Sequence, residues 1–438
     1  MTGKLIRRFL RVLFGLTVLV VLLIGLVDRT ELPRTDFYNE MTREFDAVRL
    51  TDNGASQLEA GWKKVNITPD HSMPMAGYIP RDHFDLIHDS LYARIIVVGN
   101  GSFKAAMIDV DLLIFPPLLR DRIYEKIDNS TFLYLSATHN HSGVGGWDPS
   151  IGGRLITGRF SEDYVDDIAG KISNAVKTIV TRNASMQYWE NDASEFVDNR
   201  VDPDSGKIDG KLRGIRLTRD DSTTATLFTY SGHPTSISKD RFEISADYPA
   251  KTIEVLERNS DFAMFMAGMV GSHRFRWTPL FDYEFIGDIG PKLAARIDSA
   301  NRGPAMTAPR IRSAHVPIPF GPSQLRLTKN WKVNDWVFRS ILNKLKGELT
   351  YLEFGDVVFI GTPCDFSGEI YAVDSLEAYA AKYGKHLIIT SFNGDYDGYI
   401  TYDRHYDRSS KEEVNALNWV GPYYGKYFSD MIKRLVAK

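Results

Sequence analysis

The stretch Thr131-Phe-Leu-Tyr-Leu-Ser-Ala-Thr-His-Asn-His-Ser-Gly-Val-Gly-Gly146 joins an apolar strand pattern directly to two histidines and a glycine-rich turn. The alternating Phe132, Tyr134 and Ser136 favour a β-strand, and the glycines indicate the loop that ends it. A histidine at a strand end, beside flexible backbone, is positioned to bind a metal ion and still leave room for a substrate. Zinc suits such neutral nitrogen donors. Strands also carry His-x-His pairs by chance, so this interpretation depends on the rest of the chain.

The chain downstream of residue 58 alternates strand-like and helix-like patterns. This alternation predicts a layered α/β fold, with one catalytic domain over 58–438 built on a substantial mixed sheet. The predicted strands are Tyr92–Val98, Ala105–Ile108, Phe132–Ser136, Ala225–Tyr230, Phe262–Met266, Val357–Gly361 and His386–Ser391. The predicted helices are Leu118–Lys126, Asp163–Thr181, Tyr248–Arg258, Ile286–Ser299 and Ser367–Tyr383.

The N-terminus combines basic residues with an apolar run. Residues 1–8 carry positive charge, and residues 9–27 approach the roughly 20 residues that span a bilayer. The positive-inside rule then predicts a single-pass membrane protein with a cytoplasmic N-terminus and an extracytoplasmic catalytic domain. A cleaved signal peptide is the alternative, although no Ala-x-Ala-like site follows the run. Residues 28–57 are polar and mixed, which predicts a stalk.

Overall composition narrows the function classes. The 438 residues carry a formal net charge of −3, so no bulk positive field indicates a nucleic-acid partner. The single cysteine, Cys364, excludes an intrachain disulfide. A chain of this length buries a large core and needs no covalent staples.

Three further predicted strands end in side chains that could bind a metal. His233 follows the strand that ends at Tyr230, Asp365 follows Val357–Gly361, and the loop after His386–Ser391 contains Tyr396 and Tyr399. Each has a plainer interpretation: a turn histidine, or an aspartate that caps the next helix. Open α/β sheets gather ligands at the carboxyl ends of their strands, so four such ends together favour a shared site.

Several segments of the chain resemble the neutral ceramidase family, the zinc-dependent amidohydrolases that split an N-acyl sphingoid base into a fatty acid and an amine. The matching segments occur in the family's order and cover most of residues 58–438. They are Val65-Asn-Ile-Thr-Pro69, Met75-Ala-Gly-Tyr78, Ser136–Gly146, Asn199-Arg200, Gly232-His-Pro-Thr-Ser236 and Asn393–Thr401.

The resemblance implies that His139 and His233 bind Zn²⁺ and that His141 lies close beside the metal. It also implies that Arg200 lines the pocket and that Tyr396 is a ligand, with Tyr399 as a register-dependent rival. Asp365 stands where the family has a ligating glutamate. A membrane-anchored zinc amidohydrolase acting on ceramide-like lipids is therefore expected.

The family's serine motif is altered in this chain. The position of the family's nucleophilic serine aligns with Arg274, and a serine occurs two residues earlier, at Ser272. Three possibilities stay open: Ser272 acts as the nucleophile, metal-activated water attacks directly, or catalysis is lost and the protein binds a lipid or an envelope partner. Cleavage of a different envelope amide or ester is a further alternative. His141, Arg200 and Tyr399 are the other candidate catalytic residues.

The segment Trp331–Leu345 is rich in aromatic and aliphatic residues. It predicts either an interfacial helix near the substrate entrance or an ordinary amphipathic helix packed on the domain.

Overall fold

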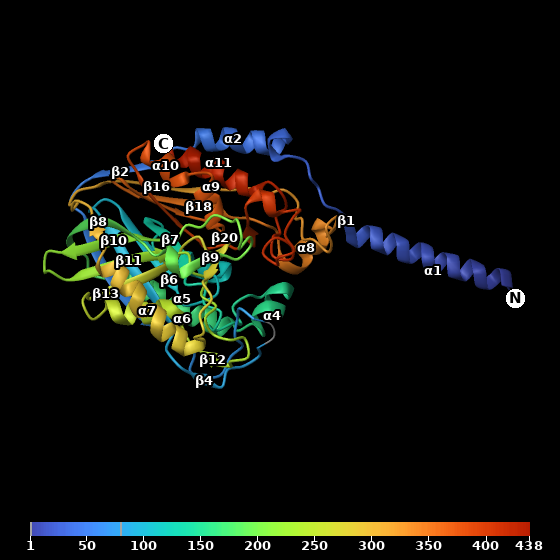
Figure 1. Ribbon diagram of the computed structural model, residues 1–438, viewed down its shortest axis with the longest axis horizontal. Helices are drawn as coiled ribbons and strands as arrows, with labels where there is room; N and C mark the ends of the chain where they lie inside the picture. Colours follow the sequence, from blue (N-terminus) through green and yellow to red (C-terminus); the bar gives the residue numbers. More distant parts are fainter. Residues whose placement is uncertain (1, 79–80) are drawn as a thin grey trace.

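Two β-sheets stacked face to face form the centre of the molecule, and helices cover both outer faces (Figure 1). The computed structural model describes residues 2–78 and 81–438. The larger sheet has the order β13-β11-β10-β8-β3-β5-β6-β7, with β15 paired to β8, and the smaller has the order β2-β16-β18-β19-β21. Strand pairs β6–β7, β11–β13 and β19–β21 are parallel and the others in these sheets are antiparallel. The predicted layered α/β domain with a mixed sheet is thus confirmed.

The larger sheet consists of β3 (Glu59–Asn66), β5 (Tyr92–Gly99), β6 (Lys104–Val110), β7 (Thr131–Ala137), β8 (Arg182–Asp192), β10 (Lys211–Arg219), β11 (Thr224–Tyr230), β13 (Phe262–Ala267) and β15 (Asn301–Arg302). The smaller sheet consists of β2 (Thr51–Ala55), β16 (Arg310–Pro317), β18 (Glu348–Phe354), β19 (Val357–Gly361) and β21 (His386–Thr390). Short strands form four further pairs: β1 (Ile24–Leu26) with β17 (Trp331–Val333), β4 (Leu86–Ile87) with β12 (Glu243–Ile244), β9 (Val197–Asn199) with β14 (His273–Phe275), and β20 (Asp365–Phe366) with β22 (Tyr399–Ile400).

The helices of the described chain are α1 (Thr2–Leu23), α2 (Asp36–Ala47), α3 (Pro117–Lys126), α4 (Ile151–Thr157), α5 (Glu162–Thr178), α6 (Asp247–Leu256), α7 (Asp282–Asp298), α8 (Asp335–Leu342), α9 (Gly368–Val373), α10 (Leu376–Ala381) and α11 (Tyr424–Val436). Short 3₁₀ turns lie at Leu32–Arg34, Ser194–Phe196 and Asp403–His405.

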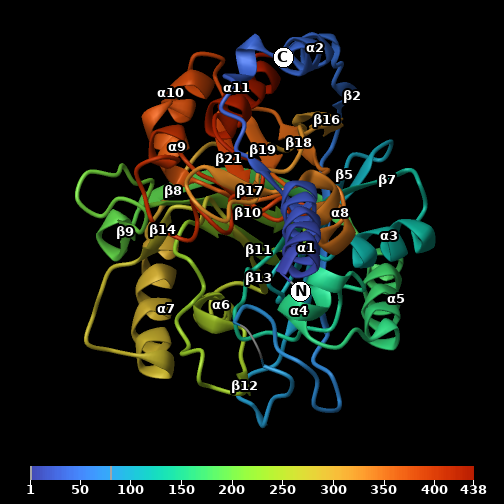
Figure 2. The same ribbon diagram turned by 90° about the vertical axis from the view of Figure 1, so that its right-hand side faces the viewer.

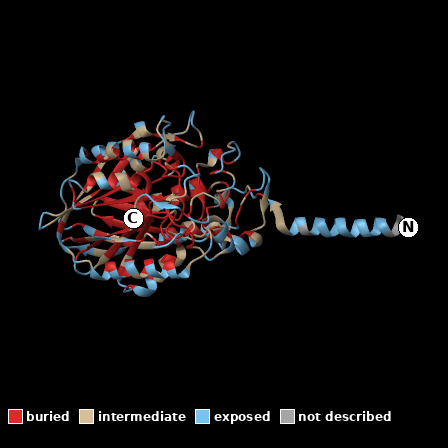
Figure 3. Ribbon diagram, turned by 90° about the horizontal axis from the view of Figure 1, so that it is seen from below, coloured by how far each residue is buried: buried red, intermediate tan, exposed pale blue. Residues whose placement is uncertain are grey.

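The core has three layers because the side chains of each sheet alternate between its two faces. On β5, Ile96 and Val98 belong to the apolar cluster between the two sheets, which also contains Phe359 of β19. Ile95 and Val97 point the other way, into the cluster beneath α3, α5, α6 and α7. The outer face of the smaller sheet is covered by α2, α9, α10 and α11. The burial colouring shows the same organisation, with a buried interior and exposed outer helix faces (Figure 3).

All seven predicted strands are present, and four of the five predicted helices are single helices. The predicted helix Ser367–Tyr383 is instead divided into α9 and α10. Ser375 adopts a left-handed conformation between them, with φ 51°, and this interrupts the helical hydrogen bonding. The segment Trp331–Leu345 begins as strand β17, and its helix, α8, starts only at Asp335.

The N-terminal segment differs from its prediction. Among residues 2–78 and 81–438, no helix has the length and apolarity of a membrane span, in contrast with the transmembrane segment predicted over 9–27. Helix α1 carries Arg7, Arg8 and Arg11, and it ends at Leu23. Its uncharged part from Val12 is therefore about 18 Å long, against about 30 Å for a bilayer core.

Residues 28–57 do not form a free stalk. Helix α2 packs Met41 and Phe45 into the cluster on the smaller sheet, and β2 pairs with β16 at the edge of that sheet. The strand is almost entirely exposed and joins the sheet through backbone pairing and polar contacts rather than through apolar side chains. This explains why its side chains show no strand pattern.

Candidate metal centre

His139, His141 and His233 come from two turns that the sheet brings together. Residues 138–141 follow the end of β7, and His233 follows the end of β11. The backbone N–H of His141 donates to Pro234 O at 3.4 Å, which joins the two turns directly. His139 has a positive φ of 61°, a strained conformation for a residue other than glycine that often marks functional sites.

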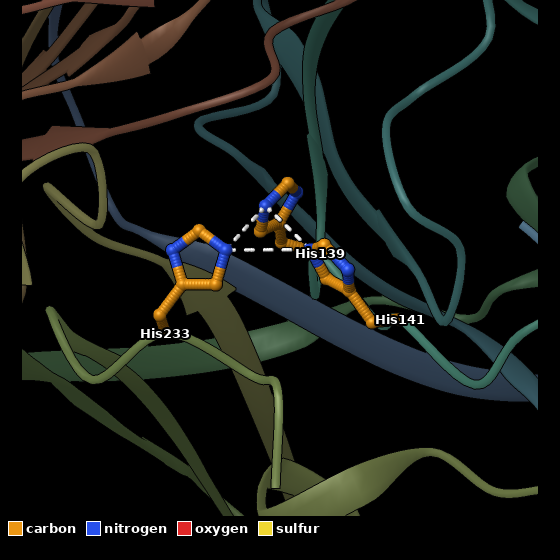
Figure 4. A group of neighbouring side chains, drawn as sticks. All are labelled: His139, His141 and His233. Carbon is orange, nitrogen blue, oxygen red and sulfur yellow. Dashed lines mark hydrogen bonds between the residues drawn. The ribbon is translucent and has the colours of Figure 1, made fainter. Parts of the chain in front are cut away.

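The three imidazoles point their Nε2 atoms at one another (Figure 4). The Nε2–Nε2 distances are 3.0 Å for His139–His233, 3.2 Å for His139–His141 and 3.3 Å for His141–His233. All three side chains are at least partly buried. The nitrogens therefore form a nearly equilateral triangle.

Backbone carbonyls fix the tautomer of each ring. Because a carbonyl oxygen only accepts hydrogen bonds, the Nδ1 atom opposite each one must carry the proton. The acceptors are Leu113 O for His139 at 2.7 Å, Gly77 O for His141 at 3.0 Å and Val270 O for His233 at 3.3 Å. Each Nε2 then directs a lone pair at the same point, and none of these nitrogens carries a proton that could form a hydrogen bond to another. The three lone pairs repel one another unless a cation lies between them.

Burial keeps the imidazoles neutral. Loss of solvation lowers the pKa of His139 and of His233 well below the usual value, and neighbouring positive charge, including that of Arg200, adds to the effect. Burial, again with the charge of Arg200, lowers the pKa of His141 to about 3. Neutral imidazole is the form that binds a metal.

This donor set fits a zinc ion. Zinc–nitrogen bonds of about 2.0–2.1 Å at tetrahedral angles separate two nitrogens by about 3.3–3.4 Å. The observed triangle of 3.0–3.3 Å needs only a slight expansion to match. Metal-binding histidines also typically donate their second N–H to a carbonyl or carboxylate, as all three rings do here.

Asp365 lies beside the triangle on the side of His139. Its Oδ1 is 3.4 Å from His139 Nε2, its side chain is fully buried, and Oδ1 has no hydrogen-bond partner among the described residues. Its Oδ2 accepts a hydrogen bond from the hydroxyl of Tyr396 at 2.8 Å. Burial raises the pKa of Asp365 to about 7. A buried oxygen without a partner, aimed at three lone pairs, also favours a cation between them.

The structure brings both candidate tyrosines to this carboxylate. Tyr396 binds it directly, whereas Tyr399 lies beside it because β20 and β22 pair Asp365 with Tyr399. The Tyr399 ring is nearly parallel to that of His233, with 6.5 Å between centroids. Burial raises the pKa of both phenols well above the usual value, so both keep their protons.

Arg200 also reaches the site, held by a carboxylate that the sequence did not single out. Its guanidinium forms an ion pair with Glu413, and its backbone N–H donates to Ser272 O at 2.8 Å. Glu413 is only 6% exposed, and its Oε2 has no hydrogen-bond partner among the described residues. Glu413 lies in the polar run Ser409-Ser-Lys-Glu-Glu413, which is typical of a surface loop, so no sequence signal distinguished it.

Ser272 is in a different environment from the one a nucleophile requires. Its Oγ accepts a hydrogen bond from the backbone N–H of Glu369 at 3.1 Å and contacts His273 Nδ1 at 3.2 Å. His273 Nε2 accepts from Asp209 N at 2.9 Å, so the proton of this ring is on Nδ1. His273 therefore donates to Ser272 and cannot act as its base. Among the described residues, no hydrogen bond joins the Ser272 side chain to a member of the histidine triangle.

Comparison with known proteins identifies the fold. No family model matches the sequence, and no curated protein matches it. Solved structures do match, and two of them align at 16% identity over 87% of this chain and 75% of the other. They are neutral ceramidase from Pseudomonas aeruginosa, at a TM-score of 0.73, and a ceramidase complexed with C2, at 0.70. The resemblance seen in the sequence thus holds for the three-dimensional structure, and this chain has the fold of neutral ceramidase.

Proposed function

We propose that this protein is a zinc-dependent amidohydrolase that cleaves the N-acyl amide bond of ceramide-like lipids. The observation that carries the proposal is the triangle of Nε2 lone pairs from His139, His141 and His233, each fixed by a backbone carbonyl. The likeness of the fold to the two ceramidases supports the choice of substrate class.

The three histidines hold the metal in this proposal. A zinc ion bound there would lower the pKa of a coordinated water to about 7 and would polarise the substrate carbonyl. The near-equal spacing of the three nitrogens favours His141 as the third ligand. Asp365 and Tyr396, the other predicted ligands, lie beside the triangle and could complete the set or act on the substrate.

Asp365 serves as the proton carrier. A catalytic base must lie within reach of the proton that it takes, and Asp365 Oδ1 lies at the edge of the triangle, 3.4 Å from His139 Nε2. Its Oδ1 has no hydrogen-bond partner among the described residues and is free to take the proton from the attacking water and return it to the leaving amine. The hydroxyl of Tyr396 holds Oδ2 and orients the carboxylate.

Arg200 and Tyr399 stabilise the charge that develops on the substrate carbonyl oxygen. Arg200 supplies a positive charge that Glu413 keeps oriented, and the neutral phenol of Tyr399 is a hydrogen-bond donor. One such donor typically contributes about 3 kcal/mol to transition-state stabilisation. Water rather than Ser272 is the nucleophile here, because the serine hydroxyl is already engaged away from the histidines.

Metal analysis and turnover by variants of the full chain test the proposal. Wild-type protein is expected to bind about one zinc per chain and to release fatty acid from a short-chain ceramide. His233→Ala and His141→Ala should lose both properties, whereas Asp365→Asn should keep the metal and lose turnover. Zinc retained by His141→Ala, together with zinc lost by Asp365→Asn, would replace His141 with Asp365 as the third ligand. Zinc binding without hydrolysis of any N-acyl lipid would instead favour a lipid-binding relative.

A further inference from the structure

Six large apolar side chains lie exposed around α4, β17 and α8. We call this set the apolar rim, and its members are Ile151, Leu155, Leu327, Trp331, Trp336 and Ile341. Leu155 is 67% exposed and Trp336 is 55% exposed. Single exposed apolar residues are ordinary, whereas several on neighbouring elements indicate an interaction surface.

The elements of the rim are side by side. Gly152 of α4 lies directly against Leu342 of α8, where a Cβ on the glycine would be 2.3 Å from the leucine Cδ2. Strand β17 leads into α8 through Asn334. Figure 2 shows α4, α8 and β17 on the same side of the molecule, around the base of α1.

Short chains of contacts connect the rim to the metal centre. Helix α4 begins soon after His141 in the sequence, and the intervening loop is anchored by the buried Trp147. On the inner face of α8, Phe338 packs against Trp419 with 5.8 Å between centroids. Trp419 packs in turn against Tyr396 at 5.3 Å. The two helices that carry most of the rim are therefore linked to the metal centre, α4 through the loop after His141 and α8 through Trp419 and Tyr396.

The rim is also positively charged. Four basic residues of the segment 326–346 are exposed, namely Lys329, Arg339, Lys344 and Lys346, and its one acidic residue is Asp335, although the whole chain has a net charge of −3. Asp335 is itself paired with Arg339 at 2.6 Å. Exposed basic residues at Lys329 and Lys344 flank the tryptophans, and Arg154 lies between the two exposed apolar residues of α4. Such a surface is complementary to negative charge.

We propose that the apolar rim docks on the surface of a bilayer that contains anionic lipids. Tryptophan and aliphatic side chains flanked by lysine and arginine form the combination that lies at a membrane–water interface, with the rings at headgroup level. Docking would place the metal centre next to lipid leaving the bilayer. The benefit of docking depends on the proposed function, because only a lipid hydrolase needs its metal centre near the bilayer. Binding to the bilayer can still be measured without any turnover of substrate.

Tryptophan quenching by brominated lipids tests the contact in the full chain. Seven tryptophans are present and none lies in α1; Trp336 donates to Leu22 O at the end of that helix, so the signal reports the domain together with the base of α1. Vesicles of brominated phosphatidylcholine with phosphatidylglycerol should quench the wild-type protein. The double variant Trp331→Phe with Trp336→Phe should lose most of this quenching. Trp277→Phe is the matched control, since Trp277 is 78% exposed on a loop outside the rim, and it should quench like the wild type.

Charge variants test the lipid class. Each basic residue near an anionic surface contributes about fivefold to binding, so Lys329→Gln with Lys344→Gln should weaken vesicle affinity roughly 25-fold. Equal binding to vesicles of phosphatidylcholine alone would overturn the anionic requirement. Unchanged quenching in the double tryptophan variant would overturn the rim as the docking surface, as would quenching lost only in Trp277→Phe. Docking without ceramide cleavage would leave this proposal standing and would refute the proposed function. Unchanged zinc content and thermal unfolding serve as the folding control for every variant.

Discussion

Replacement of Gly77 by alanine should disable the metal centre without changing any ligand. Gly77 has a φ of +97° and its carbonyl accepts the hydrogen bond from His141 Nδ1. A Cβ at this position would lie 2.6 Å from His141 Cα and 2.8 Å from His141 Cβ. Carbon atoms in ordinary contact are about 3.5–4.0 Å apart, so His141 or the Gly77 backbone must move by about 1 Å.

A movement of that size is enough to lose the hydrogen bond. The Nδ1–O distance of 3.0 Å would pass the limit of a normal hydrogen bond, and the imidazole would lose the contact that fixes its tautomer. Loss of such an outer contact typically costs 10- to 100-fold in metal affinity, or about 1.4–2.7 kcal/mol. Because the ring is also displaced, we expect Gly77→Ala to lie near the upper end of this range.

Competition with a chromogenic chelator measures the zinc affinity of the metal-depleted full chain. Gly101→Ala is the matched control, because Gly101 has a φ of +84° and nothing lies within 4 Å of its Cβ position. It carries a similar backbone strain of about 1–2 kcal/mol but is in the turn between β5 and β6. It should lose stability and keep its zinc affinity. If Gly77→Ala bound zinc within twofold of the wild type, the carbonyl contacts would not organise this site.

Three other variants test separate parts of the reasoning. Ser272→Ala should keep kcat/KM within about twofold, since the attack comes from water; a fall of a thousandfold or more would restore the serine as nucleophile. Glu413→Gln should lower kcat/KM about 10- to 100-fold at unchanged zinc content, because Arg200 loses the carboxylate that orients it. Glu413→Asp should restore part of the rate, and an unchanged kcat/KM in Glu413→Gln would contradict the role of the ion pair. Burial raises the pKa of Asp111 to about 7, so the folded state holds this proton more tightly than the unfolded chain does. Its contribution to stability is complete below about pH 4 and is lost as the pH rises through 7. The size is about 4 kcal/mol. Urea unfolding of the metal-free protein should show this loss relative to Asp111→Asn, and parallel pH curves would exclude it.

Local patterns predicted much of the fold. Strands β5, β7, β11, β13 and β19 were predicted because their apolar residues form compact runs that end at turn residues. The same reasoning predicted that His139, His233 and Asp365 stand at strand ends. It failed for β2, a polar and exposed strand held on β16 by backbone pairing and by polar contacts such as that of Asn53 with Ser313, and for α1, where the predicted span extended past the end of the helix.

The sequence alone thus determined which residue types stand at the ends of the strands and which family the chain resembles, because both depend on short-range patterns. Tertiary structure decided what those residues do. The three rings are oriented by the carbonyls of Leu113, Gly77 and Val270. Each carbonyl is at least 26 residues from the histidine that it orients, and a backbone carbonyl leaves no side-chain pattern in the sequence. The engagement of Ser272 by Glu369 and the pairing of Arg200 with Glu413 likewise arise only when segments far apart in the sequence meet. Hydrogen bonds of the backbone and contacts across the chain depend on where the chain passes, and residue identity alone does not specify that.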